Sequence, residues 1–163
     1  MHKCFFLICP TDCLEHTINK SFKNVNYFYT SLGNSFIYDS NTIGHIRKII
    51  EKHNIKEIYF VLSMDNKIVL DALNNNEFSN IRALHNFKTE IRRQKERSKI
   101  AFQEENLQFT VLSYYLNKKI KELQLAILSK ESVKISGKIY HRDTDTFTSI
   151  YSDLIALEKY QLN

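Results

Sequence analysis

The stretch IYFVLSMDNKIVLDAL, residues 58–73, changes its hydrophobic pattern in the middle. Its first five residues are all apolar or aromatic, as in a strand buried on both faces, and after Lys67 apolar residues return at helical spacing. Residues 63–67, between the two parts, carry a hydroxyl, a thioether, a carboxylate, an amide and an amine. The stretch therefore predicts a strand-to-helix junction of an α/β protein, which is where such folds usually place a functional site.

The residues before this junction alternate between strand and helix patterns. Strands are expected at Lys3–Cys9, Val25–Thr30 and Glu57–Leu62. The helices between them are expected to be capped by Thr11 or Asp12 and by Ser40 or Asn41. Short connections between alternating strands and helices predict a parallel sheet with right-handed crossovers and helices on both faces.

The second half of the chain is expected to add helices and a hairpin. A polar bridge at 74–80 precedes one helix within 80–102 and another over about 104–128. The buried stripe of the latter is predicted to be Leu107, Val111, Leu112, Tyr115, Ile120 and Leu123. Strands at 132–141 and 146–151 flank DTDT as a hairpin, and residues 153–160 read as a short closing helix.

Composition is consistent with a single cytoplasmic domain over residues 1–163. The chain is 43% hydrophobic, and no apolar stretch approaches the roughly 18 residues of a membrane span. The opening MHKCFFLICPTDC turns polar too soon for a secretory signal. Its three cysteines, at positions 4, 9 and 13, are an odd number, which suits a reducing compartment better than a disulfide framework.

The net charge of +5 permits anionic partners but does not indicate nucleic acid. Much of the excess lies in residues 88–99, where Glu90 and Glu96 interleave with the basic side chains as on a solvated helix. This run has no interleaved aromatic residues, and no recognition motif accompanies it. Neither a nucleic acid nor a membrane is therefore expected as a partner.

Four short motifs together resemble the β-class carbonic anhydrases over nearly the whole chain. Cys9 in FFLICPTDC matches the cysteine of C-x-D-S-R, and TSLGN, residues 30–34, resembles R-N-A-G-N. LSMDNK, residues 62–67, stands in the place of G-H-x-x-C-G. EENLQ and VKISGKIYHRDTDTF are similar to the family's later helix and strand, with Asn106, Gly137, Tyr140 and Thr144 in register. The order and spacing of all four motifs agree with those of the family, so together they are stronger evidence for the resemblance than any one motif alone.

The resemblance implies a specific architecture and assembly. It predicts a three-layer α/β fold around a mostly parallel five-stranded sheet of strand order 2-1-3-4-5, with the last strand antiparallel. It also implies a homodimer, which a supply of nine Tyr and eleven Phe makes physically reasonable.

The same resemblance implies that the zinc site of the family is lost. Members bind zinc through the first cysteine, the histidine and the second cysteine, and these positions are Cys9, Ser63 and Asn66 here. A protonated hydroxyl and a neutral amide are not the thiolate, imidazole or carboxylate ligands that zinc needs. The Asp and Arg of C-x-D-S-R correspond to Thr11 and Cys13, so that pair is also replaced.

Without zinc there is no activated water to attack carbon dioxide, so a non-catalytic protein with no cofactor is expected. Leu62 and Lys67 replace the glycines that flank the family's ligands, which suggests a reshaped pocket. Thr11, Cys13, Asp65 and Lys67 are the candidate residues for binding a small anion or metabolite there. A protein-interaction role is the other form of this hypothesis.

An enzyme with rebuilt chemistry is the alternative. Cys13 near a helix start could act as a reactive thiol with Cys9 as its resolving partner. Cys9, Cys13 and His16 could instead recruit a metal, with Asp12 or Asp65 as a fourth ligand. A residual carbonate dehydratase is less favoured.

The cluster at 141–143 reads as a charged surface turn, and His2 is given no role.

Overall fold

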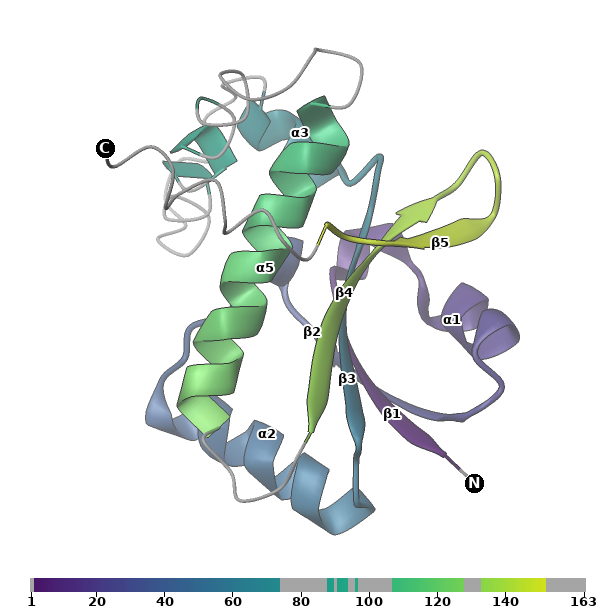
Figure 1. Ribbon diagram of the computed structural model, residues 1–163, viewed down its shortest axis with the longest axis vertical. Coiled ribbons are helices and arrows are strands. Elements are labelled where there is room, and N and C mark those ends of the chain that lie inside the picture. Colours follow the sequence, from purple (N-terminus) through teal and green to yellow (C-terminus); the bar gives the residue numbers. More distant parts are fainter. Residues whose placement is uncertain are drawn as a thin grey trace.

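The computed structural model describes residues 2–73, 88–89, 91–93, 96, 107–127 and 133–151. Its centre is a five-stranded sheet in the order β2-β1-β3-β4-β5 (Figure 1). The strands are β1 (Lys3–Ile8), β2 (Val25–Thr30), β3 (Glu57–Ser63), β4 (Lys134–His141) and β5 (Thr146–Ser149). The first four run parallel to their neighbours and β5 is antiparallel to β4. The predicted strand order and directions are confirmed.

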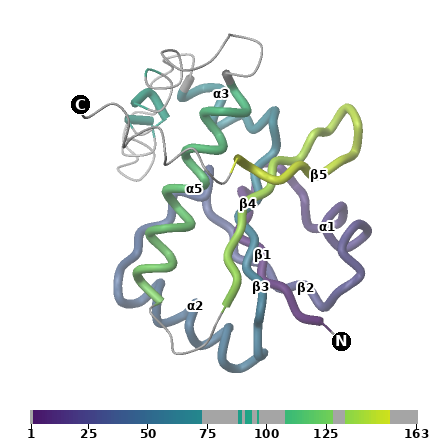
Figure 2. The backbone as a smooth tube through the Cα atoms, in the orientation of Figure 1, coloured from purple at the N-terminus to yellow at the C-terminus, as the bar shows by residue number. Residues whose placement is uncertain are grey.

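Helices cover both faces of the sheet, which confirms the three-layer arrangement. The described helical elements are η1 (Pro10–Asp12), α1 (Glu15–Ser21), η2 (Leu32–Asn34), α2 (Ser40–His53), α3 (Lys67–Leu73) and α5 (Leu107–Ile127). In Figure 1 and in the tube view of Figure 2, α1 lies on one side of the sheet, and α2 and α5 lie on the other. No helix among the described residues is long and apolar enough to cross a bilayer.

Strand β1, which lies between β2 and β3, is buried on both faces because its side chains alternate between two apolar cores. Phe5 and Leu7 belong to the larger core, together with apolar residues of α2 and α5. Phe6 and Ile8 belong to the smaller core, together with Ile18 of α1. This double burial explains the continuous apolar run that predicted a parallel strand.

The start of the first helix differs from the sequence prediction. Neither Thr11 nor Asp12 caps it, because residues 10–12 form a 3-10 turn with Pro10 at its first position. Cys13 then adopts a left-handed conformation with φ of 53°, and α1 begins only at Glu15. The prediction was wrong because the proline suits the first position of the turn, which occupies the residues expected to cap the helix.

The cap of α2 is also one residue away from the prediction. Asp39, rather than Ser40 or Asn41, is the N-cap, and its side chain accepts a hydrogen bond of 2.7 Å from the Thr42 N–H. Aspartate, serine and asparagine are all good caps, so composition alone could not distinguish between adjacent candidates.

Helix α5 has the buried stripe that its sequence predicted. Val111, Leu112, Tyr115, Ile120 and Leu123 are all buried. Several predicted features lie outside the described residues. They are the side chain of Leu107, the bridge at 74–80, most of the helix predicted within 80–102 and the closing helix at 153–160.

Tyr115 connects α5 to the turn beside the sheet. Its buried hydroxyl donates a hydrogen bond of 2.7 Å to the carbonyl of Gly33, in η2. Gly33 has a φ of 59°, a conformation that a residue with a side chain adopts only with strain. The hydroxyl of Tyr115 therefore holds a turn that depends on glycine.

We expect Tyr115→Phe to lower the free energy of unfolding by about 1–2 kcal/mol, because it leaves a buried carbonyl without its donor. Urea denaturation measures this change. Tyr29→Phe is the matched control, since the Tyr29 ring packs against Phe36 and its hydroxyl makes no hydrogen bond to a described residue. Equal effects of the two substitutions would contradict the role assigned to the Tyr115 hydroxyl.

Candidate functional site

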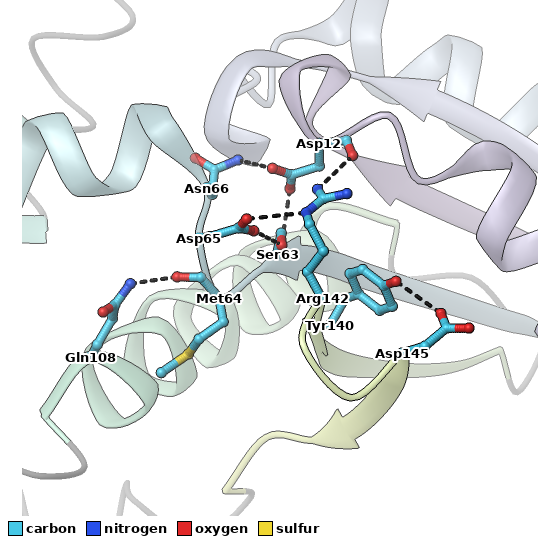
Figure 3. A network of polar contacts seen from close by, with 9 residues as sticks. All are labelled: Asp12, Ser63, Met64, Asp65, Asn66, Gln108, Tyr140, Arg142 and Asp145. Carbon is cyan, nitrogen blue, oxygen red and sulfur yellow. Dashed lines mark hydrogen bonds and ion pairs between the residues drawn. The ribbon is translucent and has the colours of Figure 1, made fainter.

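The carboxyl ends of the parallel strands β1, β3 and β4 meet at one edge of the sheet. In the register, Ile8 lies opposite Val61, and Ser63 lies opposite Tyr140. The chain leaves these strands through η1, through residues 64–66 before α3, and through the turn at 142–145. Figure 3 shows that polar side chains from all three segments converge on one another.

The side chain of Asp12 lies at the centre of this edge and is 2% exposed. Its Oδ2 accepts a hydrogen bond of 2.9 Å from the backbone N–H of Ser63. Its Oδ1 accepts one of 2.7 Å from the side-chain amide of Asn66 (Figure 3). One carboxylate therefore connects the turn after β1 to the end of β3 and to the residue before α3.

Asn66 uses both ends of its side-chain amide. While its Nδ2 donates to Asp12, its Oδ1 accepts a hydrogen bond of 2.9 Å from the N–H of Val69, in the first turn of α3. Asparagine is a favoured residue for capping a helix in this way. These two hydrogen bonds orient the amide, and its oxygen is occupied by the N–H of the helix.

Arg142 connects the β4–β5 turn to the same edge. Its Nε donates to Asp65 Oδ2 at 3.0 Å, and a terminal guanidinium nitrogen donates to the backbone carbonyl of Asp12 at 3.1 Å. The hydroxyl of Ser63 donates to the other oxygen of Asp65. We call the hydrogen-bonded group of Asp12, Ser63, Asp65, Asn66 and Arg142 the polar network.

The two carboxyl groups of the polar network differ in electrostatic environment. Burial raises the pKa of Asp12 above its ordinary value of 3.8, although the donors from Ser63 and Asn66 oppose this effect. The pKa of exposed Asp65 is lowered, first by the Ser63 hydroxyl and then by Arg142. Asp12 is the carboxyl group whose protonation the fold favours, and Asp65 is the one whose ionisation it favours.

The thiol of Cys9 lies at the same end of the sheet but makes its contacts with other groups. Its Sγ accepts a hydrogen bond of 3.1 Å from the backbone N–H of Gly33. It also lies 3.0 Å from the hydroxyl of Thr11. Cys9 is fully buried and belongs to the larger apolar core.

The structure brings only part of the predicted ligand pocket together. Asp65 joins the polar network, and Thr11 contacts Cys9. Cys13 is exposed and its thiol donates to the Pro10 carbonyl at 3.5 Å. Lys67 is exposed in the first turn of α3 and makes no hydrogen bond or ion pair with a described residue.

The geometry gives no support to a metal site or a redox pair at Cys9 and Cys13. Within the described residues, the ligand atoms of Cys9, Cys13 and His16 do not all lie within 4.8 Å of one another. Both cysteines are free, one buried and the other exposed. The left-handed residue Cys13 lies between η1 and α1. Its exposed thiol donates a hydrogen bond to the Pro10 carbonyl.

The residues that the resemblance places at the family's zinc positions do not fit a zinc ion. The Ser63 hydroxyl donates to Asp65, and the Asn66 oxygen caps α3. Only Cys9 offers an atom that zinc binds well, and its sulfur already accepts from Gly33. One thiolate does not hold a zinc ion that normally needs three or four protein ligands.

Sequence reasoning missed the two residues that organise this edge. Asp12 was considered only as a helix cap or a fourth metal ligand, and Arg142 only as part of a surface turn. A signal for Asp12 was present, because a carboxylate directly after a buried strand lies where parallel strands end. Arg142 could not have been found in this way, since its contact with Asp12 spans 130 positions of sequence.

We expect the pH dependence of stability to separate the two carboxyl groups. Because the pKa of Asp12 is raised on folding, its favourable contribution is fully present below the ordinary pKa of 3.8 and is lost as the pH rises through the raised value. For Asp65 the pKa is lowered, so its contribution is present above 3.8 and is lost as the pH falls through the lowered value.

Urea denaturation of the wild type, Asp12→Asn and Asp65→Asn between about pH 3 and pH 7 tests this expectation. The difference in unfolding free energy between wild type and Asp12→Asn should fall with rising pH. The difference for Asp65→Asn should rise with pH. Slopes of the same sign would contradict the environments described for these two groups.

Comparison with known proteins places this geometry on a known fold. No protein-family model matches the chain, and no curated protein matches it by sequence. Among solved structures, the β-carbonic anhydrase CafD of Aspergillus fumigatus is similar with a TM-score of 0.73 and 14% identity, covering 93% of this chain and 90% of that one.

Two further solved structures agree with this match. CafA of the same fungus has a TM-score of 0.69 and 13% identity over 99% of this chain and 81% of its own. A tetrameric β-carbonic anhydrase of Sordaria macrospora has a TM-score of 0.69 and 14% identity over 91% of this chain and 80% of its own. The chain therefore has the fold of the β-carbonic anhydrases.

Proposed function

We propose that this chain is a non-catalytic protein on a β-carbonic-anhydrase-like scaffold and that it works by association rather than by carbon dioxide hydration. The observation that carries the proposal is that the side chains of Ser63 and Asn66 are both engaged in hydrogen bonds within the protein. Each stands where the resemblance places a zinc ligand, and each is hydrogen-bonded to a carboxylate of the polar network. In this proposal Asp12 links the three segments at the sheet edge by hydrogen bonds, where relatives would use a metal.

The chemistry of the edge argues against a reactive centre. Both oxygens of Asp12, both ends of the Asn66 amide and two nitrogens of Arg142 have hydrogen-bond partners within the protein. A polar network whose members are paired with one another rigidifies a structure and offers few of those groups to a substrate. Such an arrangement suits a structural connection better than a catalytic site.

The charges at this edge also argue against a small anion as the ligand. Asp12 and Asp65 place two carboxyl groups there, and Arg142 is already engaged with both residues. An incoming anion would meet the Asp65 charge, which the fold keeps ionised. Of the two forms of the binding hypothesis, we therefore favour association with protein.

A second copy of the chain is the partner that we propose. Leu125 of α5 is 69% exposed and Ile37, just before α2, is 60% exposed. Large exposed apolar side chains favour association when they come together in an interface. The tetrameric assembly of the structurally similar Sordaria proteins is consistent with self-association on this scaffold.

We expect no carbon dioxide hydration above the uncatalysed rate, with or without added Zn²⁺, because the Cys9, Ser63 and Asn66 positions do not supply three zinc ligands. A stopped-flow assay with a pH indicator measures this rate, and an active β-carbonic anhydrase is the positive control. Zinc-dependent hydration that disappears in Cys9→Ser would contradict the non-catalytic proposal.

We expect the protein to be a homodimer at micromolar concentration, with a mass twice the 19.3 kDa of one chain. Light scattering measures the mass directly. If the exposed side chain of Leu125 lies in the interface, Leu125→Lys should shift the protein toward monomer. Gln124→Lys adds the same charge at the neighbouring exposed position and is the control.

A monomeric wild type would refute self-association while leaving the non-catalytic proposal intact. Dissociation by both lysine substitutions would indicate a general charge effect instead of an interface at Leu125.

A further inference from the structure

A second group of possible metal ligands lies at the opposite end of the sheet. Cys4 at the start of β1 pairs in register with Glu57 at the start of β3, and His2 directly precedes β1. Within the described residues, these three are the only His, Cys, Asp or Glu side chains whose ligand atoms all lie within 4.8 Å of one another. We propose that His2, Cys4 and Glu57 form a zinc-binding site.

The separations of the ligand atoms are close to those that zinc requires. His2 Nε2 lies 3.2 Å from Glu57 Oε2, and Cys4 Sγ lies 4.0 Å from the same oxygen. Usual zinc bond lengths at a tetrahedral angle give about 3.3 Å for nitrogen to oxygen and about 3.5 Å for sulfur to oxygen. The first distance already fits, and the second needs to shorten by about half an ångström.

The backbone positions these three side chains before any metal binds. Cys4 and Glu57 lie on neighbouring strands held by sheet hydrogen bonds, and Cys4 is fully buried. The carbonyl of His2 accepts a hydrogen bond of 3.1 Å from the N–H of Val25, the first residue of β2. The three ligands therefore come from the residue before β1, from β1 itself and from β3. Binding a metal ion there needs little movement of the backbone.

Two neighbouring side chains donate hydrogen bonds to the ligand atoms. The Tyr59 hydroxyl donates to Glu57 Oε2 at 2.6 Å, and the Asn24 side-chain amide donates to Cys4 Sγ at 3.4 Å. Hydrogen bonds of this kind orient metal ligands, and their removal typically weakens metal affinity by about 10-fold to 100-fold. Neither donor belongs to the polar network at the other end of the sheet.

The ligand chemistry favours zinc over harder cations. A thiolate, an imidazole and a carboxylate are the three ligand types that zinc uses, whereas Mg²⁺ and Ca²⁺ prefer oxygen alone. One thiolate and one carboxylate carry two negative charges, which balance a divalent ion. On binding, the Cys4 S–H bond breaks, a sulfur–zinc bond forms, and the proton passes to solvent. Three protein ligands leave the fourth position to water.

The site is open to solvent on one side. The side chains of His2 and Glu57 are 46% and 26% exposed, so an ion can approach from their side while the sulfur lies beneath. Zinc here would cross-link the amino-terminal ends of β1 and β3, and it should stabilise the folded chain, because a metal that binds only the folded state raises the melting temperature.

Metal titration of the full chain tests this proposal. After treatment with chelator and a phosphine reductant, the protein should bind one equivalent of Zn²⁺ with a rise in melting temperature. Co²⁺ should produce the near-ultraviolet charge-transfer band of a cobalt–thiolate bond. Cys4→Ser should abolish the band, while Cys9→Ser and Cys13→Ser should keep it.

Further variants keep the test decisive if Cys4→Ser fails to fold. His2→Ala changes a half-exposed residue outside the strands, and it should weaken Zn²⁺ binding at least about 10-fold, as should Glu57→Gln. Absence of the band in the wild type, or its loss in Cys13→Ser but not in Cys4→Ser, would overturn the site. Loss in Cys9→Ser alone would overturn the site as well, and it would also overturn the metal-free assignment of the other sheet edge.

Discussion

The buried carboxylate of Asp12 is the interaction on which the carboxyl end of this sheet depends. Its two oxygens accept hydrogen bonds from the Ser63 backbone and the Asn66 side chain, and so connect β1, β3 and α3. Removing a carboxylate from water is unfavourable, and burial is indeed the largest influence on its pKa. The two donors and the guanidinium of Arg142 offset part of that penalty, so these residues depend on one another for a stable arrangement.

This dependence supports the proposal that a carbonic-anhydrase-like fold keeps its shape with Ser63 and Asn66 at the positions where the resemblance places metal ligands. The sheet is held by apolar cores on both faces, which involve neither Ser63 nor Asn66. In the non-catalytic proposal the difference is local, because hydrogen bonds join the segments where the family resemblance places a metal ion. The thiol of Cys9 is part of the apolar core and accepts a hydrogen bond from the Gly33 N–H.

The two ends of the sheet differ in the ligand types that they offer. The carboxyl end has carboxyl groups, amides and a hydroxyl, and its groups are paired with one another. The amino end has an imidazole, a thiol and a carboxyl group, and neighbouring side chains donate hydrogen bonds to the last two. Because zinc distinguishes strongly between these donor types, the proposed metal site and the polar network are chemically separate features of one sheet.

The sequence by itself determined the strands, their order through the family resemblance, and the buried stripe of α5, because hydrophobic periodicity reports directly on which faces are covered. It also identified Ser63 and Asn66 as poor zinc ligands, since ligand chemistry depends on residue type alone. Only the tertiary structure decided which side chains meet. Arg142 contacts Asp12, and His2 contacts Glu57, because strand pairing brings distant residues together, and no local pattern records that pairing.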